Sequence, residues 1–223
     1  LANWTPPTRG KRDYPMTICA LVGASEFNAE HFQMMDAEEA FDYVIAVDGG
    51  FAHLEAIGRM PDMAMGDFDS LGYVPSIPQV SRFSSNKDAS DMELALRRAK
   101  TFRHKEVYVY GGLGGRLDHT LANLQLFSLF SEKGIAVTAI DRDCAITFVT
   151  GPDAIEMPAR DAGTVSVFSM NDLSSGVFER GLKWELDDVG LRNRTSLGLS
   201  NEFQGEAVMI GVEKGTLAVF MPL

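Results

Sequence analysis

The sequence predicts two parts of different fold class: an α/β N-terminal domain with a mostly parallel sheet over residues 16–150, followed by an all-β domain over residues 151–223. Up to about residue 150, short runs rich in Val, Ile, Tyr and Ala alternate with longer runs of helical spacing, which is typical of α/β layering. After Gly151-Pro152, short apolar runs are separated by turns rich in Gly, Asn and Asp, without a long amphipathic helix.

Four strands and four helices are expected in the first part. The strand runs are apolar almost throughout, which favours buried parallel strands; they are residues 17–22, 43–47, 107–110 and 136–140. Helical spacing, as in Leu117, Leu121 and Leu124, predicts helices over residues 29–41, 51–57, 91–102 and 117–130. Ser90 as N-cap and Glu93 three residues later form a capping box at the start of the third helix.

The second part is expected to end in a β-hairpin. Residues 207–212 and 216–221 are the two strand runs, and Glu213-Lys214-Gly215 is the turn between them. Gly215 would supply the positive φ that such a turn needs. At the other end of the chain, residues 1–15 carry basic side chains and three prolines without the apolar stretch of a secretory signal, so a flexible lead-in is predicted.

The acidic composition narrows the classes of function. The 223 residues include 20 Lys plus Arg against 31 Asp plus Glu, a formal net charge of -11. A nucleic-acid binder needs a basic face to neutralise phosphates, so that class is disfavoured. The longest apolar stretches are far shorter than the ~20 residues of a membrane span. With only Cys19 and Cys144, a disulfide framework is not expected, and the chain suits a reducing cytoplasm.

Polar residues that directly follow apolar runs are the first candidates for a site, because open α/β sheets bind ligands beyond the carboxyl ends of their strands. Four clusters meet this criterion: Asp48-Gly49-Gly50, Gly66-Asp67-Phe68-Asp69-Ser70, Asp88-Ala89-Ser90-Asp91, and Gly111-Gly112-Leu113-Gly114-Gly115-Arg116-Leu117-Asp118.

The second cluster has the chemistry of a magnesium site. Asp67 and Asp69 can direct both carboxylates at one cation if the loop is turned, although such a pair also occurs in solvated loops. If Asp48 and Asp91 lie nearby, each pair of like charges costs about 4 kcal/mol at 4 Å and an effective dielectric of 20. A bound cation would make this arrangement tolerable, so these four acids are the predicted catalytic residues.

The third cluster flanks a helix start, where the helix dipole favours an anion. Ser90 and Glu93 are explained by capping alone, whereas Asp88 and Asp91 are additional acids that capping does not need. These surplus acids favour a functional role for the cluster.

The glycine-rich cluster is interpreted as an anion cradle. It joins a strand to a helix, so the free amides around Gly111, Gly112 and Gly114 would point above the sheet. Arg116 could clamp a phosphate with its planar guanidinium. The run is neither a Walker A loop nor a G-x-G-x-x-G fingerprint, and a turn that needs glycine only for its shape is the simpler alternative. Transfer from a nucleoside triphosphate requires acidic side chains that hold a metal, and it requires backbone amides and an Arg on the opposite side that hold phosphate.

These motifs resemble the thiamine pyrophosphokinase family. Six signatures occur in the family's order: Val47-Asp48-Gly49-Gly50, Gly66 to Ser70, Lys87-Asp88-Ala89-Ser90-Asp91, Gly111 to His119, Gly181-Leu182-Lys183-Trp184, and Gly198-Leu199-Ser200-Asn201-Glu202-Phe203. The match spans residues 17 to 221, and six motifs in order are more specific than any one of them.

The resemblance implies an ATP-binding α/β domain, a C-terminal β-sandwich, and a homodimer that holds thiamine where the subunits meet. It implies transfer of the terminal pyrophosphate of ATP to the thiamine hydroxyl, with AMP as the second product. Asp67, Asp69 and Asp91 would hold Mg²⁺, with Asp48 beside them and with Arg116 and Asp118 lining the ATP site. Trp184, Ser200 and Asn201 would belong to the thiamine side.

Three alternatives stay open at the level of sequence. Trp184 shares strand parity with Phe178, Leu182 and Leu186, so it is either a core residue or a flat face that stacks on the aminopyrimidine ring. Asp67 and Asp69 also fit a haloacid-dehalogenase-type phosphatase, as nucleophile and acid. A non-catalytic nucleotide or thiamine sensor would keep the same fold without turnover.

Overall fold

The computed structural model describes residues 4–9, 17–84 and 88–223, and the chain divides into two compact units. The α/β unit comprises Met16–Leu126 and Val137–Arg142, and the β unit comprises Leu1–Pro15, Phe127–Ala136 and Asp143–Leu223. The chain enters the β unit at Phe127, returns to the α/β unit at Val137 and enters the β unit again at Asp143.

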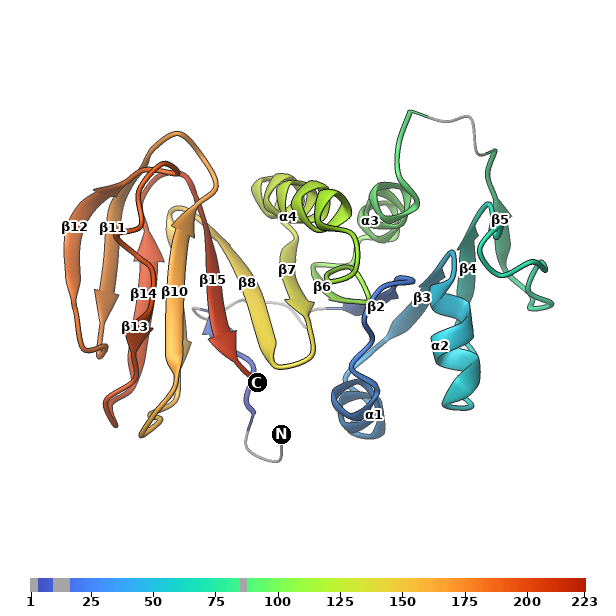
Figure 1. Ribbon diagram of the computed structural model, residues 1–223, viewed down its shortest axis with the longest axis horizontal. Helices are drawn as coiled ribbons and strands as arrows, with labels where there is room; N and C mark the ends of the chain where they lie inside the picture. The colour runs from blue at the N-terminus through green and yellow to red at the C-terminus, as the bar shows by residue number, and fades with distance from the viewer. Residues whose placement is uncertain (1–3, 10–16, 85–87) are drawn as a thin grey trace. The chain divides into compact units, whose positions relative to one another are not determined.

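The sheet of the α/β unit has the strand order β7-β6-β2-β3-β4-β5 (Figure 1). The pairs β2–β6, β2–β3, β3–β4 and β4–β5 are parallel. The strands are β2 (Ile18–Val22), β3 (Tyr43–Val47), β4 (Met63–Gly66), β5 (Val80–Arg82), β6 (Glu106–Tyr110) and β7 (Ala136–Ile140). The four strands predicted from sequence correspond to β2, β3, β6 and β7, each within one residue at either end.

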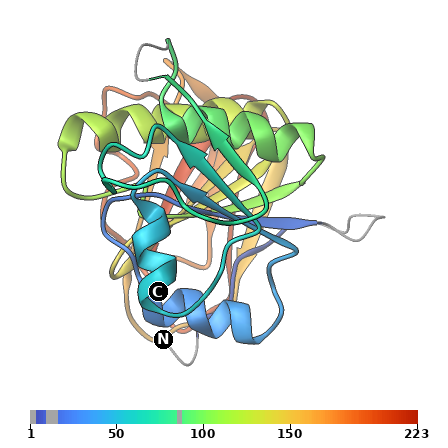
Figure 2. The same cartoon turned by 90° about the vertical axis from the view of Figure 1, so that its right-hand side faces the viewer.

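Helices cover both faces of this sheet. In Figures 1 and 2, α1 (Ala29–Ala37) and α2 (Gly50–Ala56) lie on one face, and α3 (Asp91–Thr101) and the first half of α4 (Leu117–Glu132) lie on the other. This arrangement follows from right-handed crossovers, because the chain moves outward in one direction from β2 and in the opposite direction from β6. The order of strands therefore reverses direction between β2 and β6.

The helix boundaries follow local capping. Ser90 is the N-cap of α3, and its Oγ accepts the Glu93 N–H at 3.2 Å, as predicted. The Glu93 carboxylate itself accepts from Arg97 Nη2 at 2.5 Å, one helical turn later. Helix α1 ends at Ala37 rather than at residue 41, because Glu39 takes a left-handed conformation with φ of 55° that a helix cannot continue through.

The β unit contains two antiparallel sheets (Figure 1), and residues 143–223, all of which are described, include no helix. One sheet has the order β1-β9-β14-β11-β12, and the other runs β13-β10-β15-β8. The strands are β1 (Thr8–Arg9), β8 (Cys144–Thr150), β9 (Asp153–Met157), β10 (Thr164–Ser169), β11 (Ser174–Arg180), β12 (Leu186–Leu191), β13 (Asn201–Glu202), β14 (Val208–Val212) and β15 (Thr216–Pro222). The all-β character of this part is confirmed.

The predicted C-terminal hairpin is wrong. Strand β14 pairs with β9 and β11, whereas β15 pairs with β8 and β10, so the two strands belong to different sheets. The connection pairs with Ser175 instead: the Ser175 N–H donates to the Lys214 carbonyl, and the Glu213 N–H donates to the Ser175 carbonyl. Gly215 has the expected positive φ, 108°, but it is needed to cross between sheets.

The predicted flexible lead-in is also wrong for residues 4–9. Strand β1 pairs antiparallel with β9, and Arg9 Nη1 donates to Asp153 Oδ2 at 3.2 Å. Trp4 is buried. In the described part of the chain, no helix is long and apolar enough to span a bilayer.

Candidate active site

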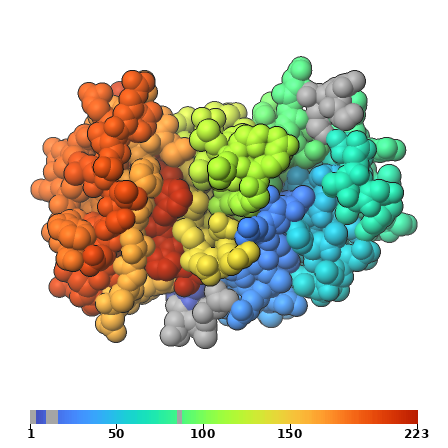
Figure 3. All heavy atoms as spheres, in the orientation of Figure 1, coloured from blue at the N-terminus to red at the C-terminus, as the bar shows by residue number. Residues whose placement is uncertain are grey.

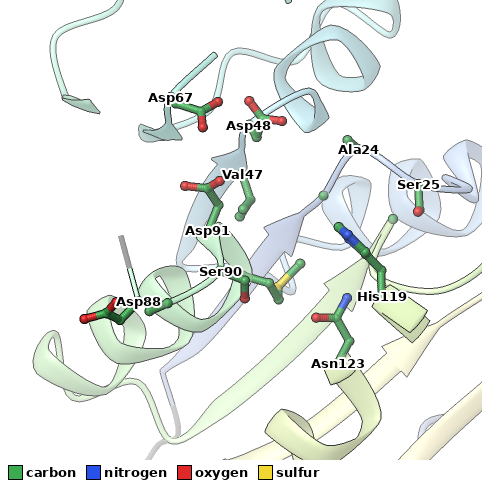
Figure 4. Close-up of a pocket in the computed structure, with 14 residues that line it drawn as sticks. Ala24, Ser25, Val47, Asp48, Asp67, Asp88, Ser90, Asp91, His119 and Asn123 are labelled. Atoms are coloured by element: carbon green, nitrogen blue, oxygen red, sulfur yellow. The ribbon is translucent and has the colours of Figure 1, made fainter. Parts of the chain in front are cut away.

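A pocket of about 530 Å³ lies at the carboxyl ends of the parallel strands in the α/β unit (Figure 4). It is built by the loops after β2, β3, β4 and β6 and by the first turns of α3 and α4. Strands β2 and β6 meet where the strand order reverses, which is where doubly wound sheets open a crevice for ligands. The lining residues are Gly23, Ala24, Ser25, Val47, Asp48, Asp67, Asp88, Ala89, Ser90, Asp91, Met92, Gly111, His119 and Asn123.

Two glycines form the floor of this crevice. The Gly23 N–H donates to the Tyr110 carbonyl at 2.7 Å, and the Ser25 N–H donates to the Gly111 carbonyl at 3.0 Å. Gly111 has a φ of 60°, and a Cβ there would lie 2.2 Å from the Gly23 carbonyl oxygen. The loops after β2 and β6 can therefore approach this closely only because both residues are glycine.

Asp48 is held at the pocket wall by its backbone and by one oxygen. It has a left-handed φ of 50°, and its N–H donates to the Met65 carbonyl at 2.7 Å. Ser70 Oγ donates to Asp48 Oδ2 at 2.9 Å. The other oxygen, Oδ1, is buried and has no hydrogen-bond partner among the described residues. A buried carboxylate oxygen left in this state fits a cationic ligand.

The Asp67-Phe68-Asp69 loop is turned by its central residue. Phe68 is buried, at 2% exposure, with a left-handed φ of 62°. This turn lets the Asp69 N–H donate to Asp67 Oδ1 at 3.2 Å. The two carboxylates take different positions as a result, because Asp67 is half-buried in the pocket lining while Asp69 is exposed and outside it.

Of the predicted acids, the structure brings Asp48, Asp67, Asp88 and Asp91 to one pocket, with Ser90 among them. Figure 4 shows Asp48, Asp67 and Asp91 along one side of it. Across the described residues, no three His, Cys, Asp or Glu side chains come close enough together to hold a metal by themselves. Magnesium commonly takes only one or two carboxylates and completes its shell with water and substrate phosphate, so these residues fit it. Lys87 of the same motif lies outside the described residues.

The glycine-rich loop contributes less to the pocket than predicted. Gly111 lines it, whereas Gly112, Gly114, Arg116 and Asp118 are not among the lining residues. Arg116 instead forms a two-pronged ion pair with Asp118, with Nε to Oδ1 at 3.1 Å and Nη2 to Oδ2 at 2.5 Å. The hydrogen bond from Arg116 lowers the pKa of Asp118 to about 2.

Seven lining residues lie outside the four predicted clusters: Gly23, Ala24, Ser25, Val47, Met92, His119 and Asn123. The rule applied to the other strands would have found the first three, because they directly follow the apolar run that forms β2. His119 and Asn123 lie one turn apart on α4, and Figure 4 shows both side chains facing the pocket opposite the acids. Asn123 Nδ2 also donates to the Gly112 carbonyl at 2.6 Å, which ties α4 to the glycine-rich loop.

In the β unit, Trp184 lies in the turn between β11 and β12 and is 54% exposed, so the core interpretation is wrong. Strand parity did not apply, because the residue is not in a strand. Lys183 Nζ lies 4.5 Å from the centre of its ring. Ser200 is exposed, with a left-handed φ of 61°, and its N–H donates to Ser166 Oγ at 3.0 Å.

Asn201 is buried and bonds to the same turn. Its Oδ1 accepts the Trp184 N–H at 3.1 Å, and its Nδ2 donates to the Trp184 carbonyl at 2.6 Å. The structure therefore brings Asn201 and Trp184 together, and it uses the Asn201 side chain inside the protein.

Two regions of the chain match two domains of one protein family. Residues 35–139 match the thiamin pyrophosphokinase catalytic domain, and residues 154–217 match the thiamin pyrophosphokinase vitamin B1 binding domain. The thiamine pyrophosphokinase of Bacillus subtilis (strain 168) is 28% identical over 180 residues, which cover 78% of this chain and 84% of that protein. Thiamine pyrophosphokinase 2 of Oryza sativa subsp. japonica is 27% identical over 212 residues, covering 87% and 73%.

Solved structures share the fold. The crystal structure of thiamine pyrophosphokinase from Bacillus subtilis superposes with a TM-score of 0.78 at 23% identity, covering 92% of this chain and 98% of that one. Thiamin pyrophosphokinase from Candida albicans gives 0.76 at 14% identity, covering 93% and 89%. Both family domains are present, in order, and together they take up most of the sequence. The chain belongs to the thiamine pyrophosphokinase family.

Proposed function

We propose that this chain carries out the reaction of its family, the transfer of a pyrophosphoryl group from ATP to the hydroxyl of thiamine, giving thiamine diphosphate and AMP. The observation that carries this proposal is a single pocket at the reversal of strand order, with carboxylates on one wall and a glycine floor. The family matches support this activity. They give no support to a phosphatase or to a non-catalytic sensor.

On the nucleotide side, Asp67, Asp69 and Asp91 are the residues proposed to hold Mg²⁺, with Asp48 beside them. Magnesium, when bound, supplies positive charge that offsets the charge of the polyphosphate. Asp67 and Asp91 already line the pocket, and Asp69 is tied to Asp67 through its backbone N–H. The unpartnered Oδ1 of Asp48 adds a further carboxylate oxygen to the same wall.

The nucleotide is proposed to be surrounded by residues of the glycine-rich loop and of the α3 start: Gly111, Gly112, Gly114, Arg116, Asp118, Asp88 and Ser90. Arg116 is exposed and paired with Asp118, and its planar fork suits a phosphate as well as a carboxylate. We infer that bound ATP competes with Asp118 for this fork. In the reaction, the thiamine hydroxyl oxygen bonds to the β-phosphorus as the bond to the α-phosphate oxygen breaks, and Arg116 would stabilise the charge that AMP carries away.

On the thiamine side, Trp184 is proposed to stack on the aminopyrimidine ring, with Ser200 and Asn201 next to it. A tryptophan that is 54% exposed and held through its own backbone is well suited to receive a flat ring. We infer that residues 16–150 serve ATP binding and catalysis, and that residues 151–223 form a β-sandwich that serves thiamine binding and dimerisation.

Replacing Trp184 by Ala is expected to raise the KM for thiamine by about tenfold or more and to change the KM for ATP less than twofold. Steady-state kinetics with each substrate varied in turn would measure both. Trp184→Phe, which keeps a flat ring, should recover most of the thiamine affinity. Equal increases in the two KM values would instead indicate a general loss of structure.

We further propose a homodimer and a cytoplasmic location. Each unit presents exposed leucines that a second copy could cover. Leu117 and Leu121 of α4 are 83% and 59% exposed, and helix α4 faces the viewer in the space-filling view (Figure 3). In the β unit, Leu197 and Leu199 are 57% and 53% exposed, close in sequence to Ser200. The chain has only two cysteines, Cys19 and Cys144, which suits a reducing compartment.

The test of the proposed function is incubation with ATP, MgCl₂ and thiamine, followed by mass analysis of the products. Thiamine diphosphate and AMP are expected in equal amounts. Inorganic phosphate released from small phosphomonoesters without ATP would favour the phosphatase, and binding of thiamine without AMP would favour the sensor.

A further inference from the structure

Glu179 is a fully buried carboxyl group to which the reaction assigns no role. It lies on β11, the strand between β14 and β12, and it is 0% exposed. Its Oε2 accepts a hydrogen bond from Asn201 Nδ2 at 2.9 Å. Its Oε1 is buried with no hydrogen-bond partner in the described part of the chain. A buried carboxyl with a single hydrogen bond destabilises a protein core, which points to a function for that hydrogen bond.

The bond to Glu179 is one of four contacts that fix which way the Asn201 amide group faces. The Asn201 Oδ1 accepts two backbone N–H groups, from Trp184 at 3.1 Å and from Glu202 at 2.9 Å. The Nδ2 donates both to the Trp184 carbonyl, at 2.6 Å, and to Glu179. In the flipped orientation the amide oxygen would face the Glu179 and Trp184 oxygens, and its NH₂ would face two N–H groups. Glu179 therefore adds a fourth contact that favours the orientation in which Asn201 binds both backbone polar groups of Trp184.

Burial raises the pKa of Glu179, and the hydrogen bond from Asn201 acts in the opposite direction. The Asn201 amide thus favours the ionised carboxylate, although any oxygen at this position can accept its N–H. The same turn is closed from a second point, because the Gly181 N–H donates to Glu185 Oε1 at 2.8 Å. Between these contacts the backbone at residue 184 is fixed while the indole ring stays exposed.

We propose that Glu179 is a positioning residue for thiamine: acting through Asn201, it holds the Trp184 turn in the conformation that presents the indole to the substrate. This inference rests on the proposed function only in naming thiamine as the ring that stacks there. Glu179 itself contacts no substrate. Its contribution is preorganisation, because an exposed aromatic side chain that is already oriented loses less entropy when a ligand binds.

The decisive variants are Glu179→Met and Glu179→Gln, both made on a Trp4→Phe background so that Trp184 is the only tryptophan. Methionine keeps the length of the side chain without an acceptor, whereas glutamine keeps an oxygen for the Asn201 N–H. Glu179→Met is expected to raise the KM for thiamine about tenfold, with the KM for ATP within about twofold, and to make Trp184 fluorescence more accessible to acrylamide quenching. Glu179→Gln is expected to restore both readouts to within about threefold of the parent.

The inference is overturned if folded Glu179→Met keeps the parent's thiamine KM and quenching, or if both KM values rise together with a loss of thermal stability. Should that variant not accumulate as folded protein, Asn201→Ala removes the same contact from the other side and must give the same thiamine-selective shift. If the parent makes no thiamine diphosphate, the proposed function fails. The quenching comparison still decides whether Glu179 positions Trp184.

Discussion

Replacing Asp67 by Asn is expected to lower the rate of thiamine diphosphate formation by about a thousandfold or more while the protein stays folded. The substitution removes one negative charge from the pocket wall and changes little else. Among the described residues, the Asp67 carboxylate accepts one hydrogen bond, from the Asp69 N–H at 3.2 Å, which an amide oxygen can accept equally well. Steady-state rates, together with circular dichroism and a thermal melt, would measure both parts of the prediction.

Glu38→Gln is the matched control, because it makes the same change of charge at an exposed position outside the pocket lining. This variant should keep the parent's rate to within about twofold, as surface substitutions do. Asp91→Asn should behave like Asp67→Asn. Near-parent turnover in either of the two pocket variants would contradict the assignment of these carboxylates to the metal.

Replacing Gly111 by Ala is expected to destabilise the protein by about 3 kcal/mol or more and to abolish ATP binding. Its Cβ would lie 2.2 Å from the Gly23 carbonyl oxygen, which is backbone and cannot move without separating β2 from β6. Because both loops line the pocket, that separation deforms the site as well as the sheet. Urea unfolding would give the stability change, and calorimetric titration with ATP would give the binding.

Gly58→Ala distinguishes the cost of left-handed backbone from the cost of the close contact at Gly111. Gly58 has a φ of 72°, similar to the 60° of Gly111, but nothing lies within 4 Å of the Cβ position. This variant should lose only about 1 kcal/mol, the cost of left-handed backbone in alanine, and it should bind ATP normally. If the two variants lose equal stability, the contact between Gly23 and Gly111 does not define the pocket floor.

Much of the fold could be predicted because the strands and helices of the α/β unit carry strong local patterns. The runs that form β3 and β6 are rich in Val, Ile and Tyr, and Ser90 marks the start of α3. Strand β4 was missed because Met-Ala-Met-Gly is short and has low β propensity, and its pairing with β3 is what makes it a strand. The hairpin failed for a related reason: strands β14 and β15 have buried side chains that suit either sheet, and only long-range pairing assigns them.

The candidate site, like the fold, could be predicted only in part. The acids at the ends of strands were predictable, because the carboxyl ends of parallel strands gather at one edge of a sheet. The contribution of His119 and Asn123 on α4 could not be predicted, because it depends on how that helix packs. Trp184 was ambiguous because strand parity assumes a strand, and a turn held by Asn201 and Glu179 places the indole outside instead. Asn201, which binds the Trp184 backbone directly, lies 17 residues away in sequence, so no local pattern reveals the contact.

In the proposed reaction, two phosphoryl groups leave ATP together in this pocket. The most direct measurement uses ATP labelled with ¹⁸O in its β- and γ-phosphates, incubated with Mg²⁺, thiamine and the protein, followed by mass spectrometry of all products. We expect thiamine diphosphate that carries both labelled groups, unlabelled AMP in equal amount, and no such products with Asp67→Asn. Labelled inorganic phosphate with ADP, or thiamine bound without any AMP, would contradict it.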